Sequence, residues 1–317
     1  MAKQALIFLI ADRAMRRSPA FETARRLAER TGSALHIFLP AWSRPIALAG
    51  LLFRRQAGQA REGHAQQLGH LLELEADALR ETGLPVSTSL VWTKRGTDEA
   101  LRRINTLKPG LVIKDAEPES AAAVLAGGAD RRLLRNCEAP VLLVHGDSST
   151  HPLCVAAAVD PQRGWPADFQ FGKRIASTAA HLATILGAEL HLLYVDRHLQ
   201  PATAASRHGH YRSAREKAAE PASDGLAVLA SGVGVPAGHC HRIPGPVAQA
   251  LAEFTSARGV DLLVIGVQPR PAWKRLLLGN RTERISRYAS CDLLVLKPDP
   301  EGAAEPRLVW GGSALPH

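Results

Sequence analysis

The chain repeats one pattern of strands and helices twice, about 150 residues apart. Internal repetition of this kind constrains a fold more than any single motif does. The stretch Leu111–Val144 aligns without a gap on Leu263–Leu296, and upstream Thr31–His36 matches Leu186–His191. Each copy is therefore predicted to be a domain, and not half of one large enzyme domain.

In each copy, apolar runs of strand length alternate with segments whose apolar residues follow helical spacing. This alternation implies parallel strands joined by right-handed crossovers, in a sheet covered by helices on both faces. The expected domains are residues 1–146 and 151–298, followed by a tail over 299–317. The expected strands are 5–11, 35–39, 86–92, 111–114 and 141–144 in copy one, and 153–159, 189–195, 239–243, 262–266 and 293–296 in copy two.

Length and composition favour a soluble protein. With 317 residues, 46% of them hydrophobic and 22% charged, two domains can each bury a core. The longest apolar run, Ile46–Phe53, is too short to span a bilayer, and the first residues do not resemble a signal peptide. The four cysteines form no Cys-x-x-Cys pair, as expected for reduced thiols. We therefore expect a cytoplasmic location and no membrane partner.

The formal charge of +9 raises the question of nucleic-acid binding. The basic residues are spread over both copies and lie among acids on predicted helices, which is typical of a solvated surface. No strand carries the aromatic residues that stack on bases. Nucleic acid is therefore not an expected partner, and a nucleic-acid-associated role remains the weakest alternative.

One set of motifs identifies a family. Leu263-Val-Ile-Gly266 is followed by Gly279-Asn280 and then by the run Cys291–Pro298, a pattern that resembles the universal stress proteins. With its duplication, the chain is similar to the tandem members of that family over roughly residues 3–298. The resemblance implies an α/β, Rossmann-like fold of HUP type in each domain, with a five-stranded parallel sheet of order 3-2-1-4-5. It also implies that the two domains pack as a pseudo-dimer.

The packing of the two copies is expected to use their fifth strands, Val141–Val144 and Leu293–Leu296. Both runs are apolar on both faces and would otherwise leave an open sheet edge. Intramolecular domain pairing is thus the first expected interaction, and a homodimer of the whole chain remains open.

In a sheet of this order, ligands bind where the strand order reverses, between strands one and four. Nucleotide-binding members carry Gly-x-x-Gly, nine residues and then Gly-Ser/Thr, because glycines let backbone N–H groups approach phosphate. Here the second glycine is replaced by Pro269, which has no N–H to donate. Any ATP or AMP is expected to prefer copy two, where the candidate binding residues are Asp160, Val195, Gly266, Gly279 and Asn280.

Copy one departs further from the family pattern, since both positions of its first glycine pair are charged in the gap-free alignment. Lys114 takes the place of Gly266, and we expect it to form an ion pair with Asp12 that closes this site to nucleotides. Alternatively, Lys114 binds an anionic head group while Ile46–Phe53 covers an apolar tail, or it points to solvent. The candidate crevice of copy one comprises Asp12, Lys114 and Gly127.

No metal site is expected. His239 and His241 share one face of a predicted strand and Cys240 lies on the other, so the three cannot converge on one ion. His208 and His210 are typical of a surface loop.

No catalytic motif is present in the sequence, whether Gly-x-Ser-x-Gly, a Walker sequence or His-Glu-x-x-His. We therefore do not expect an enzyme. The predicted function is that of a tandem universal stress protein, ligand-responsive or scaffolding. An ATP- or AMP-binding switch in copy two is the first alternative.

Overall fold

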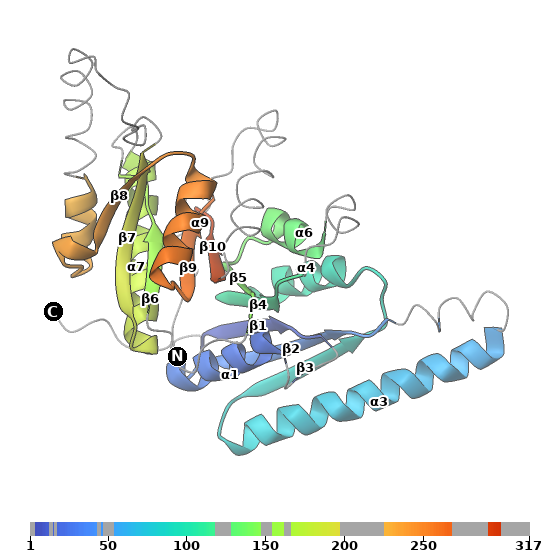
Figure 1. Cartoon of the computed structure of the whole chain (residues 1–317). Helices are drawn as coiled ribbons and strands as arrows, with labels where there is room; N and C mark the ends of the chain where they lie inside the picture. Colours follow the sequence, from blue (N-terminus) through green and yellow to red (C-terminus); the bar gives the residue numbers. More distant parts are fainter. Residues whose placement is uncertain are drawn as a thin grey trace, which may run out of the picture. The chain divides into compact units, whose positions relative to one another are not determined.

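A computed structural model describes residues 4–12, 15, 18–42, 46, 54–117, 128–146, 154–161, 166–196, 225–267 and 291–298. These residues divide into two compact units, with the division between Val144 and His145. The first unit corresponds to copy one and the second unit to copy two. In Figure 1 the first unit runs from blue to green and the second from yellow-green to red.

The first unit is built on a parallel sheet of order β3-β2-β1-β4-β5, which confirms the predicted order 3-2-1-4-5. The sheet is accompanied by helices that alternate with the strands along the chain. Its strands are β1 Leu6–Ile10, β2 Ala34–Pro40, β3 Val86–Val91, β4 Leu111–Asp115 and β5 Val141–Val144. Its helices are α1 Pro19–Thr31, α3 Arg54–Glu81, α4 Gly96–Leu107 and α6 Ala129–Asn136.

Helix α1 shows how the sequence sets one of these elements. Pro19 opens the helix, where its fixed φ is favourable and its missing N–H is not needed. Gly32 ends it with φ 64°, a left-handed conformation that glycine adopts without strain. Phe21 and Leu27 stand at helical spacing in the sequence, which predicts that they share an apolar face. The structure confirms this, because each of them is 3% exposed. Burying a side chain of that size stabilises the unit by about 1.5–3 kcal/mol.

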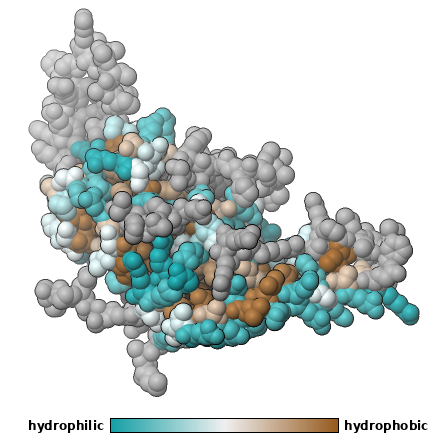
Figure 2. Space-filling model, turned by 60° about the horizontal axis from the view of Figure 1, so that its bottom comes forward, coloured by the Kyte–Doolittle hydropathy of each residue, from teal (hydrophilic) through white to brown (hydrophobic). Residues whose placement is uncertain are grey.

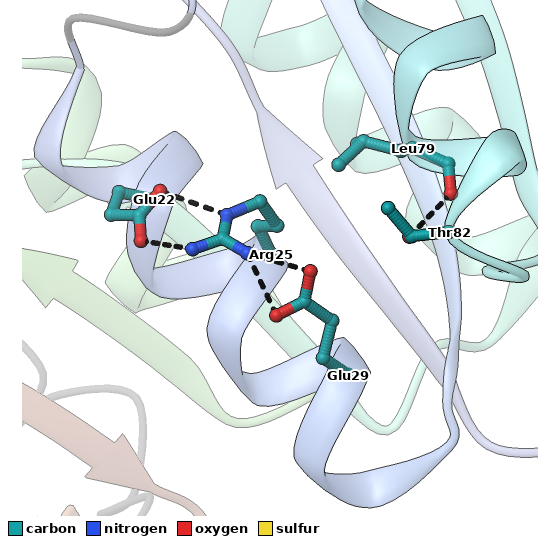
Figure 3. A network of polar contacts seen from close by, with 5 residues as sticks. All are labelled: Glu22, Arg25, Glu29, Leu79 and Thr82. Atoms are coloured by element: carbon teal, nitrogen blue, oxygen red, sulfur yellow. Dashed lines mark hydrogen bonds and ion pairs between the residues drawn. The ribbon is translucent and has the colours of Figure 1, made fainter.

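The outer face of α1 carries a charge network (Figure 3). Arg25 lies between two glutamates on successive turns, 2.5 Å from Glu22 and 2.6 Å from Glu29. Exposed ion pairs such as these two of Arg25 contribute only a few tenths of a kcal/mol each. Figure 3 also shows the end of α3, where the Thr82 hydroxyl donates to the Leu79 carbonyl at 2.7 Å.

Helix α3 packs against β3 along a narrow apolar stripe. The leucines at 68, 71, 72 and 79 follow helical spacing in the sequence, which predicts that all four share one face. Leu68, Leu72 and Leu79 are buried as predicted, whereas Leu71 is 51% exposed, so its predicted place on that face is wrong. Leu71 and Leu72 are about 100° apart around the helix, so Leu71 lies beside the buried stripe and not within it. In the view of Figure 2 apolar areas lie among hydrophilic ones.

Of the apolar run 46–53, only Ile46 lies within the described residues. Among the helices that the structure describes, none has the length and apolar character needed to cross a membrane.

The second unit repeats the architecture with a parallel sheet of order β8-β7-β6-β9-β10. A 3-10 turn, η2 Ala237–His239, precedes the third strand, which therefore starts at Cys240 and not at the predicted His239. The strands are β6 Cys154–Ala158, β7 Glu189–Asp196, β8 Cys240–Pro244, β9 Leu262–Gly266 and β10 Asp292–Leu296. The helices are α7 Pro166–Leu186, a helix over 225–232, and α9 Val247–Arg258.

The sheet register corrects the alignment of the two copies at the fourth strand. Ile10 on β1 lies opposite Lys114, whereas the corresponding residue of β6 lies opposite Ile265. Gly266 therefore corresponds to Asp115 and not to Lys114, and the pairing with the fifth strand in each unit gives the same result. The gap-free alignment was wrong by one residue because both strands are continuous apolar runs, which match equally well after a one-residue shift.

Candidate ligand crevices

Asp12 and Asp160 lie in each unit at the point where the strand order reverses. β1 neighbours β4, and β6 neighbours β9, so the strand order reverses at these pairs. Asp12 and Asp160 are exposed and stand two residues after the ends of β1 and β6, at the edge where ligands bind in such sheets. Val195 is half-buried on β7. Gly127, Pro269, Gly279 and Asn280 lie outside the described residues.

In the first unit a carboxylate from β4 reaches the N-terminus of α1. The Ala20 N–H donates to Asp115 Oδ1 at 2.8 Å, and the Ser18 hydroxyl donates to Oδ2. The free N–H groups and the dipole of a helix N-terminus favour an anion at this place. In this unit the anion is the chain's own Asp115.

Lys114 points to a different partner from the predicted one. Its Nζ lies 2.7 Å from Asp130 Oδ1 and donates to the Asp115 carbonyl at 2.8 Å. Both side chains of the ion pair are only 16% exposed. The predicted pairing with Asp12 is therefore wrong, and so is the alternative of a solvent-facing lysine. Successive side chains of a strand point to opposite faces, so Lys114 is directed to α6 while Asp115 is directed to α1.

The N-terminus of α6 also receives a carboxylate from the chain. The Ala129 N–H donates to Glu117 Oε2 at 2.8 Å, and the Glu117 N–H donates in return to Asp130 Oδ2 at 2.6 Å. We call Asp115, Glu117 and Asp130 the carboxylate clasp. It places acidic groups on the N-termini of both helices beside the β1–β4 crevice. A phosphate would meet negative charge where it needs donors, so the clasp disfavours nucleotide binding in the first unit.

The second unit has no acid at the position of Asp115, because Gly266 stands there. A Cβ on Gly266 would lie 2.4 Å from Ile175 Cδ1 and 2.5 Å from Phe171 Cε1, both on α7. The missing side chain therefore makes room for close packing of α7 on β9. Sequence reasoning assigned this space to a phosphate, and the structure shows apolar side chains in it.

The thiols in the second unit are not prepared for nucleophilic chemistry. Burial raises the pKa of Cys154 and of Cys240, and it raises the pKa of Cys291 to about 12. All three are therefore protonated at neutral pH, whereas a nucleophilic cysteine needs a lowered pKa. These thiols are free and behave as small apolar residues.

Many basic side chains of the described residues are engaged with acids. Arginines on α3, α4, α6 and β8 form ion pairs with carboxylates of the same unit. Besides Arg25, these pairs are Arg80–Asp77, Arg103–Glu99, Arg132–Asp98 and Arg242–Asp196. An arginine already paired with a carboxylate is less available to neutralise a phosphate.

Sequence reasoning missed the roles of Asp115 and Asp130, although Asp130 in the first turn of a predicted helix was a usable signal. It also missed a histidine cluster at the other end of the second unit's sheet. That cluster draws on β7, η2 and β8, and its members are far apart in the sequence.

Comparisons with known proteins agree with this architecture. The model of the "Universal stress protein family" matches residues 170–297. Universal stress protein E of Escherichia coli strain K12 is 25% identical over 288 residues, which cover 89% of this chain and 90% of that protein. A functionally unknown protein from Pseudomonas aeruginosa PAO1 has a similar structure, with a TM-score of 0.70, 22% identity and 94% of each chain covered. A universal stress protein from Archaeoglobus fulgidus has a TM-score of 0.63 at 14% identity, covering 92% of this chain and 96% of that one.

Proposed function

Because the chain belongs to the universal stress protein family, we propose that it acts in stress adaptation as a ligand-responsive or scaffold protein without robust catalysis. Its site of action would be the cytoplasm. The observation that carries the proposal is the carboxylate clasp of the first unit, which holds acidic groups on two helix N-termini. Because these acidic groups disfavour an anionic ligand, the first unit is suited to a structural role. A response to a ligand would then belong to the second unit.

The proposed ligand site of the second unit comprises Asp160, Val195, Gly266, Gly279 and Asn280. The candidate ligands are ATP and AMP. Gly266 supports the assignment only in part, since it keeps an acid away from the crevice but is covered by Phe171 and Ile175. Pro269 removes one N–H donor, so we expect weak binding.

Calorimetry with ATP and AMP tests this division between the units. Wild type should bind at most one nucleotide per chain, and Gly279→Asp should abolish the binding. Gly127→Asp is the matched control, since it places the same acid at the corresponding position of the first unit and should leave binding unchanged. Loss of binding in the Gly127 variant alone would reverse the assignment. If wild type binds neither nucleotide, the switch alternative is excluded and the scaffold role remains.

The absence of robust turnover is tested separately by phosphate release from ATP. We expect no more than slow, incidental hydrolysis, equal in wild type and Gly279→Asp after correction for occupancy. Deletion of the gene in its own host should lower survival under starvation or oxidative stress, and unchanged survival would count against the stress role. Complementation by Gly279→Asp would show that the role does not need the nucleotide.

A further inference from the structure

Three potential metal ligands meet at the N-terminal ends of β7 and β8, opposite the crevice end of the second unit's sheet. They are Glu189 and His191 on β7 and His239 at the end of η2. Their donor atoms all lie within 4.8 Å of one another, and His191 Nε2 is 3.8 Å from Glu189 Oε2. The ring centroids of His191 and His239 lie 4.5 Å apart, with the two ring planes tilted by 30° to each other.

The burial of these groups suits ligation. The His191 side chain is 4% exposed and that of Glu189 is 69% exposed, so the site has a fixed inner ligand and a mobile outer one. Donors bound to a tetrahedral zinc ion at about 2.1 Å lie roughly 3.4 Å apart. Rotation of the exposed Glu189 can bring its carboxylate to that separation without moving the sheet.

A second histidine fixes the orientation of the inner ligand. His191 Nδ1 lies 3.0 Å from His241 Nε2, so an Nδ1–H of His191 can donate to His241 and leave the Nε2 lone pair free for a metal. Metal-bound histidines are usually oriented through their second nitrogen in this way. Phe254 of α9 packs on the His241 ring, with centroids 4.9 Å apart.

The charges around the cluster can be balanced. The positive charge of Arg258 disfavours a metal ion nearby. The Arg258 guanidinium lies over the Phe254 ring, 5.9 Å from its centroid, and the negative charge of Glu189 offsets that of Arg258.

The first unit shows what the same place looks like without these ligands. His36 corresponds to His191, and its ring nitrogens lie 2.8 Å from Ser87 Oγ and 2.9 Å from Ser89 Oγ. In the sheet register, Ser87 and Ser89 correspond to His239 and His241. Ala34 stands where the second unit has Glu189, as the pairing of each with the preceding strand shows. The first unit therefore satisfies its histidine with hydroxyls, whereas the second unit replaces both hydroxyls with imidazoles and adds a carboxylate.

We propose that Glu189, His191 and His239 form a binding site for a first-row divalent cation, with zinc as the expected ion and His241 as the residue that positions His191. Two imidazoles and one carboxylate are a ligand set that zinc uses in proteins. The fourth position is left to water or to a donor from a bound partner. This inference is independent of the nucleotide proposal, because the cluster lies at the opposite end of the strands.

The test is a zinc titration of the full-length protein after EDTA treatment, in competition with a chromophoric chelator. Wild type should bind one tight equivalent that is lost in the double variant His239→Ser/His241→Ser. This variant copies the arrangement of the first unit, so it should fold with unchanged stability in the absence of metal. His241→Ser alone should keep the equivalent but weaken it about 10- to 100-fold, as for other residues that orient a metal ligand.

Two controls separate this site from adventitious binding to other histidines or thiols. Cys240→Ser should bind zinc as wild type does, and the zinc absorption spectrum should show nitrogen and oxygen neighbours without sulfur. Glu189→Gln should weaken the tight equivalent at least about tenfold. Equal zinc stoichiometry in wild type and in the double serine variant would overturn the proposal, as would sulfur in the zinc shell or loss of binding in Cys240→Ser.

Discussion

Removing the Asp115 carboxylate should destabilise the first unit through the start of α1. Two groups at this helix N-terminus, the Ala20 N–H and the Ser18 hydroxyl, donate to that carboxylate. Ser18 occupies the N-cap position, but its side chain makes no capping hydrogen bond to the helix. Asp115, which lies on β4, takes over this role and accepts the hydrogen bond of the Ala20 N–H. Asp115→Ala leaves both donors without their acceptor.

The magnitude follows from two contributions. Loss of an N-cap side chain costs about 1 kcal/mol, within a range of about 0.5–2 kcal/mol. Loss of the favourable interaction between a carboxylate and the helix dipole adds roughly 0.3–1 kcal/mol. We therefore expect Asp115→Ala to lower the free energy of unfolding by about 1–3 kcal/mol. Asp115→Asn keeps one carbonyl acceptor without the charge and should lose about half as much.

Urea denaturation of the full chain, followed by hydrogen exchange of the Ala20 amide, measures the global and the local effect. Asp77→Ala on α3 is the matched control, because Asp77 is 63% exposed and pairs only with a neighbouring turn. Its effect should stay below about 0.5 kcal/mol. The reasoning fails if Asp115→Ala is no more destabilising than the control, or if the exchange of the Ala20 amide does not change.

Three further outcomes are expected. Gly266→Ala should destabilise the second unit by about 1–3 kcal/mol in urea denaturation, because the added Cβ would overlap side chains of α7. Gly172→Ala is the control and should be neutral or stabilising, because its Cβ would make only ordinary contacts. Equal effects of the two substitutions would show that the packing of α7 on β9 is not tight. Burial, followed by the charge of Arg103, lowers the pKa of His36 in the folded state. The neutral His36 therefore contributes fully to the folding stability above the unfolded pKa of about 6.5, and this contribution is lost as the pH falls through the lower folded pKa. His36→Asn should flatten the fall in unfolding free energy between pH 7.5 and 5, and an unchanged slope would contradict the prediction. The halves 1–146 and 151–298, expressed separately, should dimerise or aggregate in size-exclusion chromatography, and two monomeric halves would count against pairing through the fifth strands.

The positions of the strands and helices could be predicted from apolar periodicity and from repetition, whereas the strand order was implied by the resemblance to the universal stress proteins. The positions of Phe21 and Leu27 on α1 needed only helical spacing. The correspondence of Asp115 to Gly266 could not be found in this way, because a strand that is apolar on both faces matches its repeat equally well after a shift of one residue. Only the hydrogen-bonded register of the neighbouring strands resolves that shift.

Partners of polar side chains were harder to predict than elements. The direction of the Lys114 side chain from β4 leads it to Asp130 and not to the predicted Asp12. The histidine cluster depends on the register of β7 against β8, which places residues about 50 positions apart side by side. His239 and His241 were visible in the sequence, but their relation to His191 was not.

Duplication explains why the two units can differ at corresponding positions without loss of the fold. At the end of the fourth strand, Asp115 satisfies a helix N-terminus while Gly266 admits the side chains of α7, and both solutions stabilise the same β-α packing. At the start of the second strand, His36 is satisfied by hydroxyls while His191 faces a further imidazole and a carboxylate. In the first unit, Asp115 and His36 are hydrogen-bonded to other groups of the chain at these two positions. In the second unit, one position has no charged side chain and the other brings together the proposed metal ligands. A chain with two copies can therefore satisfy these two positions internally in one unit, while the other unit is free to diverge at the same positions.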